Sequence, residues 1–428
     1  MKAQLISIGN ELLIGDTTNT NATWIGQFLH DLGIEVARVY TISDDEHIIR
    51  STVEQSMLES DLVITTGGLG PTHDDITKTT IANLFNVDLV QNEQVLNHIK
   101  DIFRTRNIPF SESNKWQAMV PVNSEVLFNK VGTAPGMWFN AGDCLLAVLP
   151  GVPHEMKYLM KHGVYTKIKV LNSYDGYRHT EYIKTAGIGE STLSDHILGD
   201  VSSYLNEDVS LAFLPTFGEV TLRITGRGTP RQKVEKSTQA LLSYIRKKAY
   251  KYIYGFDKNY SLCEAVGDLL KTKNKKIAIA ESCTGGLIAH SMTDISGSSA
   301  YFIGGIVSYA NSMKLRQLNV SMTDLNKFGA VSKTVALQMA KGIAKTTGAD
   351  VGLSTTGIAG PDGGTKQKPV GTVWIGFYSK EQHFAVKALF TKDRQVNKQR
   401  TKTMALELVR RVLSNIDEIP YSLKKEFA

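Results

Sequence analysis

The sequence predicts an α/β protein: two three-layer α/β domains with parallel or mixed sheets, joined by a small α+β domain. Two observations support this class. Short apolar runs typical of buried strands alternate with amphipathic stretches of helical period in the first and the last third of the chain. In addition, a length of 428 residues exceeds what one ordinary core accommodates. We place the domains at residues 1–170, 171–257 and 258–428.

The first domain begins with alternating strands and helices. The helix expected over 21–33 carries Ala22, Ile25 and Leu29 on one stripe and stops at Gly33. A second helix has Pro153 near its first turn, where the missing N–H costs nothing. The predicted strands are 4–9, 34–42, 61–66 and 144–150, and the predicted helices are 21–33, 44–60 and 153–162. Repeated β-α units of this kind indicate a parallel, doubly wound sheet.

The pattern changes in the middle domain and changes back after it. Between 171 and 257 we expect a strand, turn and helix over 182–198, paired strands at 209–215 and 219–228, and a helix over 234–248. After 258 the α/β alternation returns without repeating the first domain. Its predicted strands are 276–280, 303–309, 351–357 and 371–378, and its predicted helices are 262–271, 284–292, 311–318, 332–348 and 402–413.

Composition excludes several classes of protein. No apolar run approaches the roughly 20 residues that span a bilayer, and the N-terminus lacks a signal-peptide cleavage pattern. Cys144, Cys263 and Cys283 are widely spaced, with no CxxC pair. This cysteine usage argues against a disulfide framework or structural zinc site and fits the reducing cytoplasm, where we expect the protein.

The net charge of +6 is mild for this length. The densest basic clusters, at 246–251 and 271–276, contain only one aromatic residue, Tyr250, and we interpret them as solvated linker faces and not as a nucleic-acid groove. The middle domain also has no GxxG loop of the kind that clamps RNA. We therefore expect phosphorylated small molecules as partners, and neither a membrane nor a nucleic acid.

A glycine-rich loop follows the strand at 61–66. Gly67, Gly68 and Gly70 remove the Cβ atoms that would hold a phosphate away from the backbone N–H groups. Asp74 and Asp75 could hold a Mg²⁺-type ion that bridges phosphate oxygens. The alternative is that Asp75 only caps the helix that follows it.

Two further loops and one helix start belong to the same edge of the sheet, because ligands bind at the carboxyl ends of strands in open α/β sheets. They are 9–11, the glycine-bearing turn 132–137, and Glu155. Taken singly, each is better explained by a structural role than by a catalytic or binding role. For Glu155 the reason is that the helix dipole favours a carboxylate near a helix start.

A second candidate site lies at the corner after the strand 276–280, where Ser282, Cys283 and Thr284 are adjacent. If the helix begins at Ser282, the N–H groups of Cys283, Thr284 and Gly285 lie in its first turn. There they would be free to bind an oxyanion. The alternative is that Ser282 or Thr284 is an ordinary N-cap.

A serine nucleophile needs a base, and only two histidines, His290 and His383, lie in this domain. His290 would stand roughly 12 Å from Ser282 by helical rise, which is too far for a hydrogen bond. Lys314 follows the neighbouring strand after one short turn, so its amine could reach the same edge of the sheet. It would have to be neutral, and burial favours that state. The alternative is an exposed helical lysine.

The choice of nucleophile follows from the neighbours. A cysteine nucleophile needs a histidine nearby to hold the thiolate, and none is apparent for Cys283. Thr284 carries a β-methyl group that crowds the approach to a carbonyl. We therefore expect Ser282 to attack and Cys283, Thr284, Gly285 and Gly286 to bind the oxyanion or the substrate.

The glycine-rich loop 357–365 and the last helix supply further binding groups. Gly360, Asp362 and Gly363 could contact the ribose or phosphate of a nucleotide, and Arg394 and Lys398 could bind its phosphate.

Several motifs resemble those of the competence/damage-inducible CinA family, in order and over nearly the whole chain. In the first domain they are SIGNELLIGDTTNTNA, TTGGLGPTHDDIT, GTAPGM and LPGVPHEM. In the last they are AESCTGG, GGIVSYANSMKLRQL, FGAVSKTVALQMAKG and TGIAGPDGGTKQKPVGTVWIG.

The resemblance implies a molybdopterin-binding-like first domain with metal-dependent ADP-ribose pyrophosphatase activity. For the last domain, which also occurs alone as PncC, it implies an amidohydrolase without a cofactor. That enzyme would convert nicotinamide mononucleotide to nicotinate mononucleotide and ammonia, with Ser282 and Lys314 as the catalytic pair. The family commonly has arginine where Lys398 stands. Lysine keeps the charge but loses the bidentate fork.

We thus expect a bifunctional enzyme of pyridine-nucleotide salvage, with a divalent metal in the first domain only, acting as a homodimer or higher homo-oligomer. Two alternatives stay open. The first domain could bind a nucleotide or a molybdopterin-like ligand without turnover, as an accessory protein, or the protein could be a nucleic-acid or recombination partner, as the family name suggests.

Overall fold

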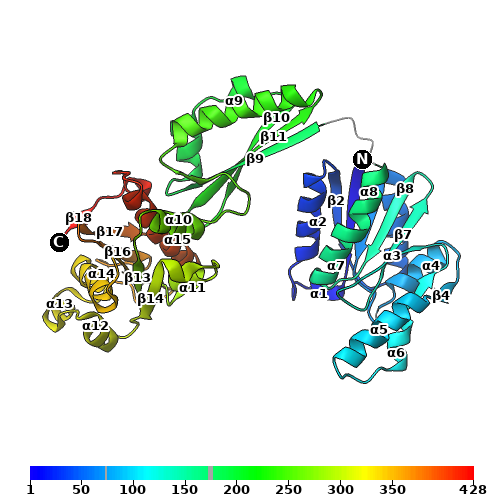
Figure 1. Cartoon of the computed structure of the whole chain (residues 1–428), viewed down its shortest axis with the longest axis horizontal. Helices are drawn as coiled ribbons and strands as arrows, with labels where there is room; N and C mark the ends of the chain where they lie inside the picture. Colours follow the sequence, from blue (N-terminus) through cyan, green and yellow to red (C-terminus); the bar gives the residue numbers. More distant parts are fainter. Residues whose placement is uncertain (73–74, 172–176) are drawn as a thin grey trace. The chain divides into compact units, whose positions relative to one another are not determined.

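A computed structural model describes residues 1–72, 75–171 and 177–428. The chain divides into two compact units, Met1–Asp175 and Gly176–Ala428 (Figure 1). Both contain β-sheets covered by helices, so the predicted α/β class is confirmed. Within the described ranges, no helix is both long and apolar enough to cross a membrane.

The first unit is built on a six-stranded mixed sheet of order β2-β1-β3-β8-β7-β6. β1 (Lys2–Ile8), β2 (Glu35–Ile42), β3 (Leu62–Thr66) and β8 (Cys144–Leu149) run parallel. β7 (Gly136–Ala141) and β6 (Glu125–Leu127) are antiparallel additions. The four parallel strands end at one edge, so the loops that follow them gather there.

Helices cover both faces of this sheet. On one face, Ile25 of α2 (Thr20–Asp31) and Met156 of α7 (Pro153–Leu159) pack into a core with Leu5 of β1. On the other, Ile49 of α3 (Glu46–Glu59) and Ile81 of α4 (Thr77–Leu84) pack with residues of β1 and β3. Successive β1 residues serve opposite cores because side chains alternate along a strand.

The first unit also has elements that the sequence patterns left out. Between α4 and β7 the chain forms β4 (Leu89–Gln91), α5 (Glu93–Thr105), α6 (Glu112–Trp116) and β5 (Met119–Pro121). β4 and β5 pair as a separate two-stranded sheet. A short helix α1 (Asn10–Leu13) follows β1, and α8 (Tyr165–Leu171) follows α7 after a π-helical turn.

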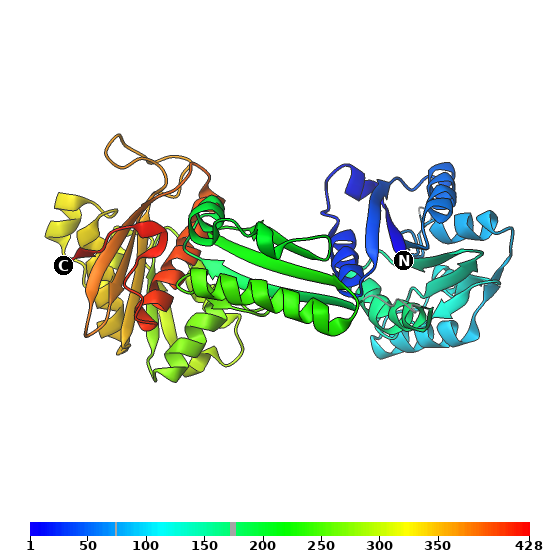
Figure 2. The ribbon, with the colours of Figure 1, turned by 90° about the horizontal axis from the view of Figure 1, so that it is seen from above.

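The second unit begins with a four-stranded antiparallel sheet of order β10-β11-β9-β12. Its strands are β9 (Tyr177–Ala186), β10 (Val209–Pro215), β11 (Glu219–Gly228) and β12 (Ile253–Gly255). The helix α9 (Arg231–Ala249) lies along the strands (Figure 2). It buries Leu241 and Ile245 in the core that it shares with them. This is the α+β arrangement predicted for the middle of the chain.

A second six-stranded mixed sheet follows, in the order β14-β13-β15-β16-β17-β18. β13 (Ile277–Glu281), β14 (Phe302–Val307) and β15 (Val351–Gly357) are parallel. β16 (Thr372–Tyr378), β17 (His383–Leu389) and β18 (Glu426–Phe427) continue the sheet antiparallel. Of these, β17 and β18 were not predicted.

Helices again cover both faces. One core gathers α10 (Leu262–Thr272), α11 (Leu287–Thr293) and α15 (Arg394–Leu413). The other gathers α12 (Asn311–Leu318), α13 (Met322–Phe328) and α14 (Lys333–Thr347). Because β13 has a parallel neighbour on each side, its carboxyl end lies between the ends of β14 and β15, which places three loops around one point.

Candidate functional site

The corner after β13 is a five-residue turn, and this corrects the expected helix start. Residues 282–286 form the turn, in which Gly285 and Gly286 have φ of 64° and 94°, and α11 begins only at Leu287. A left-handed backbone at two successive positions explains why both are glycine. The N–H groups of Cys283 and Thr284 are therefore presented by a turn and not by a helix.

Hydrogen bonds inside the corner decide which N–H groups are free. Gly285 donates to the carbonyl of Ser282 at 3.2 Å, and Gly286 donates to the carboxylate of Glu281 at 3.0 Å. The N–H of Gly285 is therefore not free, contrary to the prediction, and the N–H of Gly286 is engaged as well. In the part of the chain that the structure describes, the N–H groups of Cys283 and Thr284 donate to no oxygen.

Lys314 lies on α12 and points back to the corner. Its Nζ lies 3.1 Å from Oγ of Ser282, 2.7 Å from the carbonyl oxygen of Ser308 and 3.2 Å from that of Tyr309. The side chain is only 1% exposed, and this burial lowers the pKa of its amine. Among the described residues, no carboxylate forms an ion pair with it. The expected proximity of the serine and the lysine is thus present.

A pocket of about 200 Å³ opens at this corner. Four of the predicted residues line it: Ser282, Cys283, Lys314 and Arg394. Gly357 and Ala359, from the predicted loop 357–365, also line it, whereas the patterns missed Tyr309, Asn311, Ala330, Val331 and Thr356. Asn311 could have been predicted from the sequence, since it precedes Lys314 by three residues and therefore lies on the same face of the helix.

The other two candidate nucleophiles are buried and differently placed. Burial raises the pKa of the Cys283 thiol to about 12, so at neutral pH it is a thiol and not a thiolate. The hydroxyl of Thr284 lies 2.7 Å from that of Thr355 on β15, inside the protein. Ser282 is the member of the three whose side-chain oxygen contacts Lys314.

The predicted nucleotide-binding residues divide into two groups. Arg394 donates to the carbonyl of Gly360 at 2.9 Å and to the hydroxyl of Tyr309 at 3.1 Å, which fixes its guanidinium at the pocket. Nζ of Lys398 lies 3.8 Å from where a Cβ on Gly285 would stand. By contrast, Asp362 and Gly363 are exposed and do not line the pocket.

The two histidines of this domain lie away from Ser282, as expected. His290 is 71% exposed and lies 3.7 Å from Asp294, whereas the His383 ring lies 3.0 Å from the carbonyl of Leu337. Neither lines the pocket.

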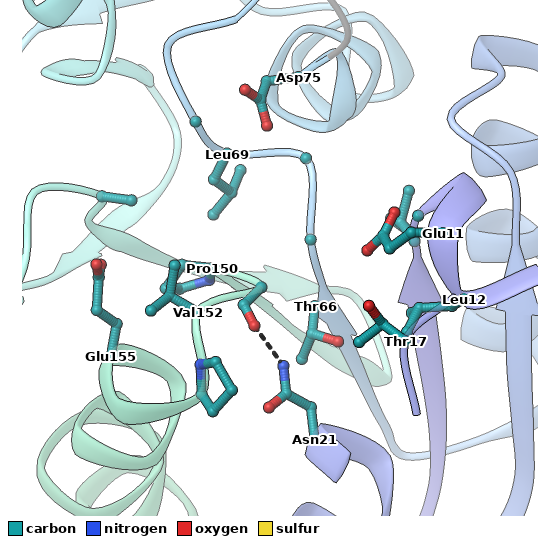
Figure 3. Close-up of a pocket in the computed structure, with 18 of the residues that line it drawn as sticks. Glu11, Leu12, Thr17, Asn21, Thr66, Leu69, Asp75, Pro150, Val152 and Glu155 are labelled. Atoms are coloured by element: carbon teal, nitrogen blue, oxygen red, sulfur yellow. Dashed lines mark hydrogen bonds between the residues drawn. The ribbon is translucent and has the colours of Figure 1, made fainter. Parts of the chain in front are cut away.

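The first unit has a larger pocket, of about 510 Å³, at the carboxyl edge of its sheet (Figure 3). The four predicted regions, three loops and one helix start, meet there. Gly67, Gly68, Gly70 and Asp75 line it together with Gly9 and Glu11 from the first loop, Thr133 and Ala134 from the 132–137 turn, and Glu155. Thr17, Asn21, Asp44 and Thr66, which also line it, were not predicted.

The glycines of this pocket have a structural reason that the sequence did not reveal. A Cβ on Gly67 would collide with the carbonyl of Ile8, one on Gly68 with the hydroxyl of Thr77, and one on Gly70 with the carboxylate of Asp75. Gly67 and Gly68 also have left-handed φ values of 112° and 65°. Packing therefore requires glycine at these positions, independently of any ligand that the loop binds.

Two carboxyl groups that line the pocket, those of Asp75 and Glu155, differ in their burial and in their hydrogen-bond partners. Oδ2 of Asp75 accepts from the backbone N–H of Thr72 at 3.0 Å and from its hydroxyl. Glu155 is buried, which raises its pKa, and it accepts from Nδ2 of Asn129 at 2.6 Å. Next to Asp75, burial lowers the pKa of Lys78 to about 8. Asp74, the other predicted metal ligand, lies outside the described residues.

These residues fit one kind of metal site only. Among the described residues, no three His, Cys, Asp or Glu side chains gather to hold an ion. Oδ1 of Asp75 has no hydrogen-bond partner in the same ranges. Mg²⁺ commonly takes one or two carboxylates and completes its shell with substrate phosphates and water. Asp75 fits a site of that kind and not an all-protein cage.

Three family models match the chain. They are described as "Probable molybdopterin binding domain" over residues 4–169, "Damage-inducible protein CinA KH domain" over 180–255 and "CinA C-terminal domain" over 259–413. The sequence patterns predicted an α+β middle domain but not a KH domain, because the middle domain lacks the GxxG loop by which RNA-binding KH domains are identified.

Similar proteins match over almost the full length. A "CinA-like protein" of Cytophaga hutchinsonii is 42% identical over 97% of this chain and 98% of its own. Another, from Salinibacter ruber, is 43% identical over 97% of this chain and all of its own. Among solved structures, the protein CinA of Thermoplasma acidophilum aligns at 36% identity over 39% of this chain and 97% of its own, with a TM-score of 0.36.

Proposed function

The chain belongs to the CinA family, and on that basis we propose that its C-terminal domain deamidates nicotinamide mononucleotide to nicotinate mononucleotide and ammonia. The observation that carries the proposal is the contact between Ser282 and a buried lysine that has no ion-pair partner among the described residues. A buried amine of this kind is favoured in its neutral form, in which it can act as a base.

The three oxygens around Nζ of Lys314 match the three N–H groups of a protonated amine, and they also accommodate the neutral amine that a base requires. Such an amine has two N–H donors and one lone pair. The carbonyls of Ser308 and Tyr309 match the two donors, and the lone pair then faces the hydroxyl of Ser282. Lys314 accepts the serine proton while Oγ attacks the carboxamide carbon of the substrate.

The oxyanion that forms needs donors that are not already engaged. Among the described residues, the N–H groups of Cys283 and Thr284 donate to no oxygen. They lie beside the Cys283 sulfur, a weak acceptor that an oxyanion can replace, and they follow Ser282 directly. Protonated Lys314 then gives its proton to the leaving nitrogen, so that ammonia departs and an ester of Ser282 remains. Water attacks the ester, Lys314 takes its proton and returns it to Oγ, and the carboxylate product is released.

Binding of the rest of the substrate falls to the start of α15. The pocket of about 200 Å³ is of a size suited to a nicotinamide ring but not to a whole nucleotide. The phosphate therefore extends toward the cations at the rim, Arg394 and Lys398, which lie on one face of α15 four residues apart.

For the N-terminal domain we propose hydrolysis of ADP-ribose at its diphosphate, with a divalent metal ion. The pocket of about 510 Å³, with its glycine loop and carboxylates, supports this activity. When bound, the metal would neutralise charge on the phosphate oxygens. Asp75 would hold it through Oδ1. Backbone N–H groups of residues 68–70 would orient the diphosphate, because the N–H of Gly67 already donates to the carbonyl of Leu149 at 3.1 Å.

The test uses the full chain with both substrates. Wild-type protein should release ammonia from nicotinamide mononucleotide and cleave ADP-ribose when Mg²⁺ is present. Ser282→Ala should abolish only the first reaction and Asp75→Asn only the second. Binding of ADP-ribose without cleavage would instead favour a first domain that holds a ligand without turnover.

A further inference from the structure

Glu281, the last residue of β13, is a charged side chain in the core of the Ser282 corner. It is 1% exposed. Its Oε2 accepts from the N–H groups of Gly286 at 3.0 Å and Ile288 at 3.2 Å, and its Oε1 accepts from Ala289 at 2.8 Å. A buried carboxylate is costly unless hydrogen bonds compensate it, and these three do so.

These bonds replace the usual cap of α11. The N-cap position is Gly286, which has no side chain to accept from the first N–H groups of the helix. Glu281 reaches across the turn and takes them instead. The 282–286 turn is thus closed at both ends, by β13 before it and by the carboxylate after it, and this closure fixes the backbone that carries Ser282.

The main chain of Glu281 is tied to the base as well. Its carbonyl accepts from the N–H of Ser308 at 2.7 Å, and the carbonyl of Ser308 in turn accepts from Nζ of Lys314 at 2.7 Å. In the sheet, Glu281 pairs with Val307 of β14 and Thr355 of β15. One residue therefore connects the turn that bears the nucleophile with the strand end that holds the lysine.

The carboxylate also decides where charge can bind. Free N–H groups at a helix start attract anions, but here Glu281 occupies them. Among the described residues, the N–H groups of the 282–286 turn that donate to no oxygen are those of Cys283 and Thr284, which lie beside the weakly accepting Cys283 sulfur. The reacting end of the pocket is consequently suited to a neutral carboxamide, while the anionic phosphate is drawn to Arg394 and Lys398.

We infer that Glu281 is the positioning residue of this site: its carboxylate sets the turn so that Ser282 faces Lys314 and two N–H groups face the substrate. This inference rests on the proposed deamidation. It gives Glu281 no contact with the substrate, so its removal should lower kcat and leave KM nearly unchanged.

The experiment compares Glu281→Gln with a matched control, Glu264→Gln. Glu264 also caps a helix, α10, where it accepts from the N–H and hydroxyl of Ser261 at 2.7 Å each, but it does not line the pocket. Three quantities are measured in the full chain: the steady-state constants for ammonia release, the rate of labelling of Ser282 by a fluorophosphonate, and amide hydrogen exchange.

We expect Glu281→Gln to lower kcat about a hundredfold with KM within about threefold, because a misplacement of about 1 Å at reacting groups costs that much. Labelling of Ser282 should slow in parallel, and the amides of Gly286 and Ala289 should exchange faster. Glu264→Gln should lower thermal stability without changing kcat. Should Glu281→Gln fail to fold, Glu281→Asp, which keeps the charge but retracts it by one methylene, should show an intermediate loss.

Two results would overturn the inference. One is a kcat within about threefold of wild type in Glu281→Gln although the amides of the turn exchange faster. The other is an equal loss of kcat in Glu264→Gln. If the wild-type protein releases no ammonia from nicotinamide mononucleotide, the proposed function fails, whereas the labelling rates of Ser282 in wild type and Glu281→Gln still test the positioning role.

Discussion

Nζ of Lys314 lies 3.1 Å from Oγ of Ser282, although the two residues are 32 positions apart in the chain. The contact exists because β13 and β14 are parallel neighbours, so the turn after one strand and the helix after the other meet at the same edge. The lysine reaches this point through the core and without a carboxylate partner among the described residues.

Replacing either member of this pair should abolish deamidation. Ser282→Ala and Lys314→Ala should each lower the rate of ammonia release from nicotinamide mononucleotide by at least about a thousandfold, because a nucleophile and its base act as one unit. The double variant should lose little more than either single one. Additive losses would contradict a cooperating pair.

Replacing the neighbouring cysteine should do little. Burial raises the pKa of the Cys283 thiol to about 12, and its N–H survives a change to alanine. Cys283→Ala should therefore keep most of the ammonia release. Iodoacetamide at about pH 8 should not inactivate the wild-type enzyme, because almost no thiolate is present. An inactive Cys283→Ala together with an active Ser282→Ala would reverse the assignment.

The pH dependence should report the amine of Lys314. Its pKa is lowered by burial, and only the neutral amine accepts the serine proton. The kcat/KM for deamidation should rise about tenfold per pH unit and level off below the pKa ordinary for lysine. Because the unfolded chain binds the extra proton more readily, the contribution of this group to the free energy of unfolding also rises with pH over that interval. A profile independent of pH would remove the lysine as base.

Lys398 should affect binding more than chemistry. Lys398→Ala should raise the KM for nicotinamide mononucleotide more than it lowers kcat, because a phosphate contact far from the amide stabilises ground and transition states alike. Lys345→Ala, which removes an exposed lysine on α14, is the matched control and should change neither constant. An unchanged KM in Lys398→Ala would make Lys398 a surface residue.

Metal dependence should be confined to the first domain. A chelator should abolish ADP-ribose hydrolysis and added Mg²⁺ should restore it, while deamidation stays unchanged. Asp75→Asn should lower hydrolysis by orders of magnitude. Thr72→Ala removes a hydroxyl donor to Asp75 but no carboxylate, so it separates support of the loop from metal binding and should cost far less. Full hydrolysis in the presence of chelator would exclude the metal role.

Much of the fold could be predicted because its signals are local. Apolar runs such as those of β1, β3, β13 and β15 are buried on both faces of their sheets, and such strands form continuous apolar stretches in the sequence. The positions of Ser282 and Lys314 after adjacent strands were informative for the same reason. The segment from β4 to β5 and the strand β17 were missed because they are short or lack a clear period.

The α/β class, the order of most strands and helices, and the pairing of a serine with a lysine could all be inferred from the amino-acid sequence. Three features depend on the three-dimensional fold: the start of α11, the set of N–H groups in the turn that donate to no oxygen among the described residues, and the lining of the pocket by Tyr309, Asn311 and Thr356 but not by Asp362. The two sets of features differ in how far apart in the chain the interacting residues are. Periodicity and turn propensity depend on neighbours in the chain, whereas the contact of Glu281 with Ala289, the burial of Lys314 and the packing around Gly67 depend on residues brought together by the fold.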